Sequence, residues 1–235
     1  MKIRLVHSLC MLSLFSASVA YGGAGDDPFL TSGKLSQFEV RDEDDHDLVV
    51  LDGQFWAGYD LNKFWLAAEV ERIGGETEEF ELQALYGRAI SPFWNLQVGA
   101  RKDFSPDPER EWGVLALHGV APYYLEVDAS LFLGGAGRTS VRVEAEYELL
   151  LTQRLILSPE VEINAYGFND AETGAGSGIG EAEVGLRLRY EIYRKFAPYV
   201  GLNWHKKLGE TADFARAKGN DIEDTQLVLG IRAWY

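Results

Sequence analysis

The stretch from Arg138 to Gly167 constrains the fold more than any other, because it alternates apolar and polar side chains with a strict period of two. One side of TSVRVEAEYELL is apolar and the other carries arginine and glutamate. After a tight LTQ connection, RLILSPEVEINAYG repeats the pattern with Pro159 as its one irregular position. The alternation predicts two long β-strands that share one apolar face. A soluble core would bury the glutamates of the other face with only Arg142 to compensate, and unpaired buried charge is very costly, so this face must meet water.

Two architectures leave one face wet: a soluble sandwich, and a membrane-spanning barrel with lipid outside and a polar lumen. Strands of about ten residues fit the barrel. The alternation runs from about Leu35 to Tyr235 and gives about twelve strands, an even number that places both termini in the periplasm. Glycine is frequent, as suits barrel strands and turns. We therefore predict an all-β fold, a transmembrane antiparallel up-and-down β-barrel of about 12 strands in the bacterial outer membrane.

The connections between the expected strands agree with this topology. Short turns alternate with longer or more polar loops, as an up-and-down barrel requires and a sandwich does not predict. The short turns, which we place in the periplasm, lie at Asp60, Ser91, Ala121, Leu151 and Tyr193, and the longer connections at Asp42, Ser105, Phe168 and the polar loop Lys207 to Asp224. Aromatic residues beside the short turns predict one interfacial girdle made by Phe93, Trp94, Tyr123, Tyr124, Tyr193 and Phe196.

The first residues indicate export. Lys2 and Arg4 precede the apolar run LCMLSLFSASVA, which ends in a small-x-small cleavage signal and is shorter than the roughly 20 residues of a transmembrane anchor. We expect residues 1–20 to be a signal peptide, residues 21–33 a short periplasmic lead and residues 34–235 the barrel. The last strand ends on the outward aromatic Tyr235, which resembles the signal of outer-membrane barrels. Gram-negative outer-membrane lipids and, through Tyr235, the barrel-assembly machinery are the expected partners.

Loss of that leader would remove every sulfur atom from the chain, because Met1, Cys10 and Met11 all lie within it. The mature protein would then have no disulfide, thiolate site or thioether site. Its formal charge would change from −15 to −17 with the loss of Lys2 and Arg4. So acidic a chain is not expected to bind nucleic acid, and its natural ligands are cations.

Three stretches resemble the copper resistance protein B family: DLNKFWLAAEVERIGGETEEFELQALYGRAISPFWNLQVGARKDF, EAEYELLLTQRLIL and GLRLRYEIYRKFAPYVGLNW. The similarity extends from about Asp27 to Tyr235. It implies an outer-membrane barrel that takes part in copper resistance by export or sequestration, with a periplasmic copper oxidase or copper carrier as a candidate partner. Many members carry a methionine- and histidine-rich segment before the barrel; here YGGAGDDPFLTSG stands in its place, which speaks against a soft Cu(I) site.

Nitrogen and oxygen ligands remain, and they suit weakly bound Cu(II). His46 lies in an acidic loop with Asp44, Asp45 and Asp47. This loop is either a solvated rim of the barrel or a metal site.

Two further histidines are expected to face the lumen. His118 lies near the periplasmic end with Glu126 opposite it across the hairpin, either as a structural hydrogen bond or as a ligand pair. His205 lies near the outer end, close to Glu183. At opposite ends of a span of roughly 25 Å, these histidines cannot share one ion. Our hypothesis is that the two pairs are successive weak stations along an acidic path.

Inward carboxylates outnumber inward arginines along the expected strands. The lumen is therefore either a cation path or a salt-bridge network that fills a narrow barrel. An outer-membrane lipase would need a serine and a histidine on the outer wall, but no histidine falls on an outward position and no Gly-x-Ser-x-Gly motif occurs. We expect no enzyme. The remaining alternatives are a generic outer-membrane channel and a structural or adhesive barrel, neither with copper chemistry. A copper-tolerance assay after gene deletion would separate them from a copper protein.

Overall fold

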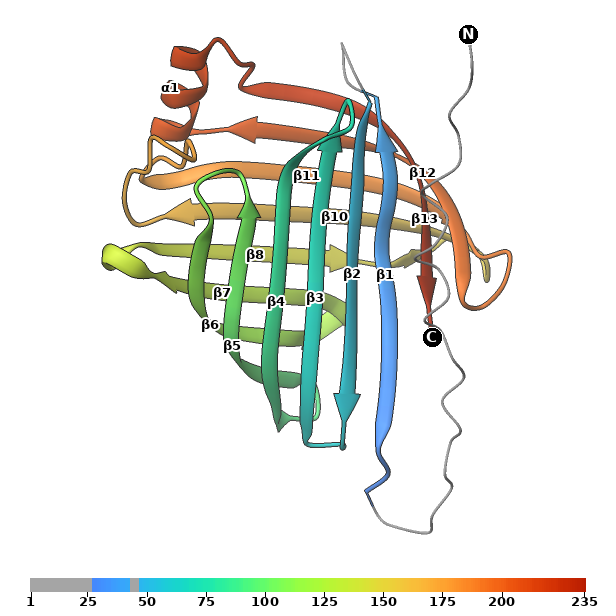
Figure 1. Cartoon of the computed structure of the whole chain (residues 1–235). Helices are drawn as coiled ribbons and strands as arrows, with labels where there is room; N and C mark the ends of the chain where they lie inside the picture. The colour runs from blue at the N-terminus through green and yellow to red at the C-terminus, as the bar shows by residue number, and fades with distance from the viewer. Residues whose placement is uncertain (1–26, 43–46) are drawn as a thin grey trace, which may run out of the picture.

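The chain forms one closed antiparallel β-barrel (Figure 1). The structure is a computed structural model that describes residues 27–42 and 47–235. Each strand pairs with its neighbours in the sequence, and β13 pairs with β1 to close the sheet. Strands β8 and β9 are separated by Glu148 and both pair with β10, so together they make one crossing of the wall. The twelve crossings confirm the predicted up-and-down barrel.

The strand bounds are β1 Leu30–Arg41, β2 Leu48–Gly58, β3 Asn62–Ile73, β4 Glu76–Ser91, β5 Trp94–Ser105, β6 Arg110–Ala121, β7 Leu125–Gly134, β8 Thr139–Tyr147, β9 Leu149–Leu150, β10 Leu155–Tyr166, β11 Gly178–Tyr190, β12 Phe196–Lys207 and β13 Glu223–Trp234. Within the described residues, the remaining elements are two 3₁₀ turns, Pro122–Tyr124 and Gly135–Gly137, and one helix, α1 Gly209–Lys218. The first strand begins at Leu30, so four residues of the expected lead belong to the wall. The expected signal peptide lies outside the described residues.

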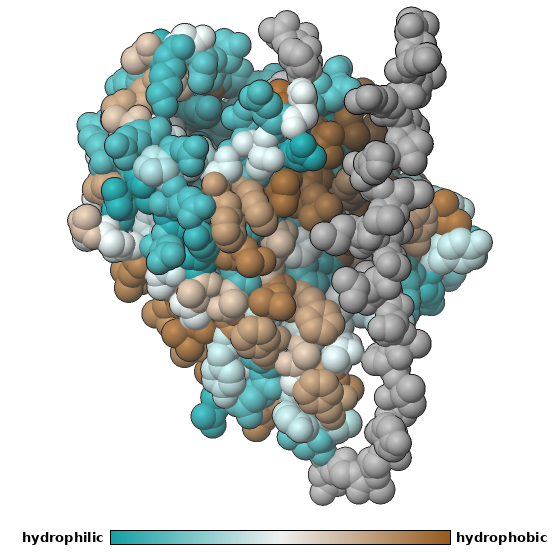
Figure 2. Space-filling model, viewed as in Figure 1, coloured by the Kyte–Doolittle hydropathy of each residue, from teal (hydrophilic) through white to brown (hydrophobic). Residues whose placement is uncertain are grey.

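Side chains alternate across the wall as the period of two predicts. Val141 and Val143 are exposed on the outer surface of β8, whereas Ser140 and Glu146 are buried on the lumen side. Apolar side chains that point outward lose contact with water only when lipid surrounds the wall, which gives the barrel its preference for a membrane. Figure 2 shows hydrophobic side chains spread over the wall and a largely hydrophilic surface around α1.

The two ends of the barrel differ in their connections. We call one the turn end, formed by residues 59–61, 92–93, 122–124, 151–154 and 191–195, and the other the loop end, formed by residues 42, 47, 74–75, 106–109, 135–138, 167–177 and 208–222. All turn-end connections are short, as predicted, but three loop-end connections, residues 74–75, 106–109 and 135–138, are equally short. The expected aromatic residues Phe93, Tyr123, Tyr124 and Tyr193 are exposed at the turn end.

The C-terminal residue belongs to the wall. The backbone N–H of Tyr235 donates to Gly33 at 2.8 Å, and the N–H of Gly33 donates back at 3.1 Å. The Tyr235 ring is exposed on the outside, as expected, and the ammonium of Lys195 lies 4.3 Å from its centroid.

The connection between β12 and β13, predicted to be a polar loop, contains α1. The sequence carries the usual end signals of a helix, with Glu210 in the first turn, Arg216 and Lys218 in the last, and Gly219 at the C-cap with φ 80°. The prediction of a loop rested on the polarity of this segment alone and missed these helix end signals. Thr211, Ala212 and Ala215 form the buried side of α1. No helix in the described ranges is both long and apolar enough to cross a bilayer.

Candidate functional site in the barrel lumen

Two cavities occupy the lumen, one of about 460 Å³ toward the loop end and one of about 190 Å³ toward the turn end. Five side chains line both cavities and lie where they meet; we call them the partition: Gln37, Glu69, Arg142, Glu160 and Glu162. They come from β1, β3, β8 and β10, so they reach across the barrel interior rather than along one hairpin. The lumen is therefore divided near its middle.

Arg142 is the centre of the partition. The alternation of β8 points it inward between the outward Val141 and Val143. Its guanidinium donates to Glu69 at 3.2 Å and to Glu81 at 3.1 Å. Its Nε lies 3.5 Å from a Glu162 carboxylate oxygen. A planar guanidinium has five N–H donors and can hold several carboxylates at once, which is why one residue connects β3, β4 and β10.

Next to Arg142, a second arginine and a ring fill one side of the lumen. Arg101 contacts Glu81 at 2.7 Å and Asp103 at 2.6 Å, and its guanidinium lies 4.6 Å from the centroid of the buried Phe132 ring. Phe132 packs in an apolar cluster with Trp65, Leu85, Val114 and Ala116. The sequence prediction of a polar lumen missed this cluster, although Phe132 lies between the outward Leu131 and Leu133.

A further ion-pair group surrounds Glu39, which is fully buried. Its carboxylate accepts from Arg187 at 2.5 Å, from Arg41 at 2.9 Å and from the hydroxyl of Tyr199 at 2.8 Å. Arg187 also donates to Glu160 of the partition at 2.8 Å. Glu39 and Arg41 were missing from the predicted lumenal residues, although the outward side chains beside them place both on the inner face.

The turn-end cavity contains its own paired charges. Arg232 donates to both carboxylate oxygens of Glu146, at 2.5 and 3.1 Å, and Arg189 donates to Glu148. These bidentate and charge-assisted bonds hold β13 against β8, and β11 against the residue between β8 and β9, through the lumen. The lumen therefore contains a salt-bridge network, which is one of the two alternatives that the sequence left open.

Carboxylates nevertheless outnumber basic side chains in the lining of both cavities. In the loop-end cavity the carboxylates are Glu69, Glu71, Glu78, Glu79, Asp103, Glu160, Glu162, Asp170, Glu181, Glu183 and Asp224, against Arg41, Arg101, Arg110, Arg142, Lys207 and Lys218. In the turn-end cavity they are Asp52, Glu69, Glu81, Glu126, Asp128, Glu144, Glu146, Glu160 and Glu162, against Lys34, Arg142, Arg187, Arg189 and Arg232.

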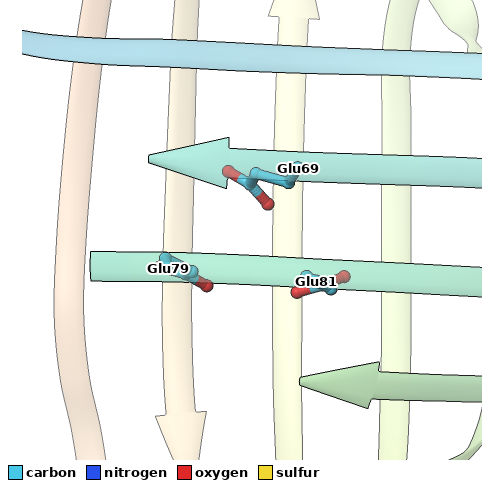
Figure 3. A group of neighbouring side chains, drawn as sticks. All are labelled: Glu69, Glu79 and Glu81. Carbon is cyan, nitrogen blue, oxygen red and sulfur yellow. The ribbon is translucent and has the colours of Figure 1, made fainter. Parts of the chain in front are cut away.

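Three of these carboxylates lie together on adjacent strands (Figure 3). Glu69 on β3 and Glu79 and Glu81 on β4 place one oxygen each within 4.8 Å of one another. Arg142 bonds Glu69 and Glu81, whereas Glu79 has no ion pair or hydrogen bond within residues 27–42 and 47–235. Carboxylate oxygens at this spacing can coordinate a divalent cation. No sequence motif marks this triad, because its members become neighbours only through the register of β3 and β4.

The loop-end cavity is covered by residues 167–177 and α1, which we call the cap. Arg110 donates to Asp170 at 2.8 Å, and Arg138 lies 3.4 Å from the same carboxylate oxygen. Burial raises the pKa of Asp170, but the hydrogen bond and charge of Arg110 outweigh it and hold the pKa below its usual range. The hydroxyl of Thr211 accepts from the N–H of Gly176 at 2.9 Å. A side chain at Gly176 would collide with the α1 backbone, so the approach of the two cap segments requires glycine.

The predicted pairing of His118 with Glu126 is wrong. The three-residue turn Pro122–Tyr124 places His118 opposite Asp128, and their Nδ1 and Oδ1 atoms are 2.6 Å apart. Glu126 lies opposite Val120, two residues further along, and its carboxylate is 3.7 Å from the ammonium of Lys34. The prediction failed because it centred the turn between β6 and β7 one residue too early, and this shift changes the partner of His118 by two residues.

His205 and Glu183 are register partners on β12 and β11, as predicted, and both line the loop-end cavity. Glu183 accepts from Arg41 at 3.1 Å. His118 lines the turn-end cavity, so the two histidines lie in different cavities. Asp47 is exposed ahead of β2, and the rest of the candidate acidic loop, Asp44, Asp45 and His46, lies outside the described residues.

Comparison with known proteins identifies the family. Residues 30–235 match the family described as Copper resistance protein B precursor (CopB). The chain belongs to the copper resistance protein B family. It is 46% identical over 199 residues to the Copper resistance protein B homolog of Pseudomonas syringae pv. tomato, and 39% identical over 201 residues to Copper resistance protein B of Escherichia coli. These matches cover 85% and 86% of this chain and 68% of each relative.

Among solved structures, the NanC porin matches with a TM-score of 0.57 at 11% identity, covering 87% of this chain and 99% of that chain. Identity this low supports the fold alone. The family and the fold together make this copper resistance protein B member an outer-membrane β-barrel, as the sequence predicted.

Proposed function

We propose that this barrel contributes to copper resistance by sequestering Cu(II) in its lumen. The observation that carries the proposal is the Glu69–Glu79–Glu81 triad in the lining of the divided lumen, in which Glu79 has no basic partner within the described ranges. Because no basic group bonds Glu79 directly, its carboxylate oxygens are available to a cation. The family supports the copper role, and the partition favours retention over free diffusion between the two ends.

The ligand chemistry supports reversible holding. Carboxylate and imidazole are oxygen and nitrogen donors, which suit Cu(II) better than Cu(I). Both ligand types bind metal only when deprotonated, so affinity falls in acid. Two arginines already neutralise part of the triad, and we therefore infer weak binding. His205 with Glu183 in the loop-end cavity, and His118 with Asp128 in the turn-end cavity, are the candidate secondary ligands.

Export is the second candidate, and the carboxylate lining on both sides of the partition favours it. An ion crossing the lumen would meet carboxylates in each cavity but would have to pass Arg142, whose positive charge repels it. Export therefore requires Arg142 to leave its carboxylates, whereas sequestration does not.

We propose a non-enzymatic role. Within the described part of the chain, His118 and His205 both face the lumen, so neither can serve as the base of a serine hydrolase on the outer wall.

The test is Cu(II) titration of the purified barrel, with Glu79→Gln as the variant. Glu79 has no arginine partner, so its neutralisation leaves no guanidinium unpaired. We expect Cu(II) affinity to fall by about tenfold, since one of three oxygen donors loses its charge. Glu76→Gln is the matched control, because Glu76 is an exposed residue of the same strand that lines neither cavity.

Copper tolerance of a deletion strain that expresses each variant provides the second readout. Sequestration predicts that Glu79→Gln restores tolerance less well than Glu76→Gln does. Equal Cu(II) affinity and equal tolerance for the two variants would exclude the triad as the binding site. Copper efflux from vesicles separates the two candidate functions, because only export predicts efflux through the unmodified barrel.

A further inference from the structure

A surface groove of about 510 Å³ lies at the turn end, between the connection of β9 to β10 and that of β11 to β12. The two connections are joined by a backbone hydrogen bond of 2.8 Å from the N–H of Glu191 to the carbonyl of Arg154. The strands on either side pair in register from Leu155 and Tyr190 onward. The groove is therefore a fixed feature of the rim.

The groove has an apolar side. Leu150 is 68% exposed and Tyr193 is 73% exposed, and Ile192 beside Tyr193 is also exposed. These side chains lie where the apolar outer wall ends, which is the level of the lipid headgroups in a barrel of this type. A bound lipid would cover these exposed apolar side chains with its glycerol and with the part of its acyl chains nearest the headgroup.

The groove also has a basic side. Arg154 and Arg194 both line it, are both exposed, and form no ion pair within residues 27–42 and 47–235. This contrasts with the lumen, where Arg41, Arg142, Arg187 and Arg232 all bind carboxylates. Glu191 is the one acidic side chain in the groove lining, so the groove is positive on a strongly acidic protein.

We propose that this groove binds an anionic phospholipid of the periplasmic leaflet. The phosphate lies between Arg154 and Arg194, whose planar guanidinium groups match its oxygens, and the acyl chains run along Leu150 and the adjoining wall. The lipid supplies both the anion and the apolar tail that the groove requires, whereas free phosphate supplies only the first. The site is independent of copper and of the lumen.

The test counts lipids that remain bound to the detergent-purified barrel by native mass spectrometry, with phosphatidylglycerol and phosphatidylcholine as probes. The parent protein is expected to retain phosphatidylglycerol in preference to phosphatidylcholine. Arg154→Gln with Arg194→Gln is expected to weaken that retention by about tenfold, since two charge-assisted contacts are lost. The control double variant, Arg72→Gln with Arg216→Gln, removes two exposed charges at the loop end and should keep the parent's retention.

Three results would overturn the proposal: equal retention of the two lipids by the parent, an equal loss in both double variants, or displacement of the lipid by soluble glycerol phosphate at matched concentration. The first excludes an anion preference, the second indicates general charge attraction, and the third indicates a simple anion site. Heat-modifiable mobility checks folding of all variants. Mobility should be unchanged for the groove variant, because neither side chain forms an ion pair or a side-chain hydrogen bond with the rest of the described chain.

Discussion

Replacement of Arg142 by glutamine should open the partition while leaving the barrel folded. The guanidinium holds Glu69 at 3.2 Å and Glu81 at 3.1 Å and approaches Glu162 at 3.5 Å. Without it, Glu81 keeps Arg101 at 2.7 Å and Glu162 keeps the amide of Asn164 at 2.7 Å. Of these three carboxylates, Glu69 alone is left with neither an ion pair nor a hydrogen bond in the described ranges.

The loss of folding stability in Arg142→Gln can be estimated from the contacts that remain. Removing one partner of a fully buried ion pair costs about 3–5 kcal/mol. Here the Arg142 and Glu69 side chains are 18% and 30% exposed and the cavities can admit water, so screening reduces the expected loss to about 1–2 kcal/mol. Urea unfolding in lipid vesicles measures this loss directly.

Single-channel conductance in planar bilayers measures whether the partition opens. Glutamine is shorter than arginine and carries no charge, so Arg142→Gln should join the two cavities and remove the positive charge between them. We expect cation conductance to rise several-fold over the parent. Arg189→Gln is the matched control, because Arg189 is also a lumenal arginine that bonds a carboxylate, here Glu148, but it lines only the turn-end cavity. Unchanged conductance in a folded Arg142→Gln barrel, or an equal rise in Arg189→Gln, would refute the role of Arg142.

Three further predictions concern the cap, the facing of β8 and the last strand. The folded-state pKa of Asp170 lies below its unfolded value, so its contribution to cap stability is present above about pH 4 and is lost as the pH falls through the folded pKa. Hydrogen-exchange protection of residues 167–177, taken relative to the intrinsic exchange rate at each pH, should therefore fall in acid in the parent, and Asp170→Asn should show weak protection at every pH. Cysteine at Val143 should react with lipid-soluble reagents and cysteine at Glu144 with water-soluble ones, and the reverse pattern would mean that the facing is wrong. Tyr235→Asp should impair outer-membrane assembly, measured as loss of heat-modifiable mobility, and normal assembly would count against a signal at Tyr235.

The amino-acid sequence by itself determined which face of each strand meets lipid. Successive side chains of a strand point to opposite sides, so the period of two around Val143 and Glu144 was enough to separate wall from lumen. The number of crossings followed from the same pattern, and three stretches of sequence were enough to indicate the family. Helix α1 was also within reach of the sequence, because Glu210, Arg216 and Gly219 mark its ends, but loop polarity concealed it.

Only the tertiary structure decided which lumenal side chains meet. Glu39 and Arg187 are 148 positions apart, and Arg142 and Glu69 are 73 apart, yet each pair shares a hydrogen bond across the barrel. Such contacts depend on the register of every hairpin and on the closure of β13 against β1, and a change of one residue in the centre of a turn changes the partner. The exchange of Glu126 for Asp128 opposite His118 shows this directly. Alternation is a local property of the chain, whereas the division of the lumen by Arg142 is a property of the closed sheet.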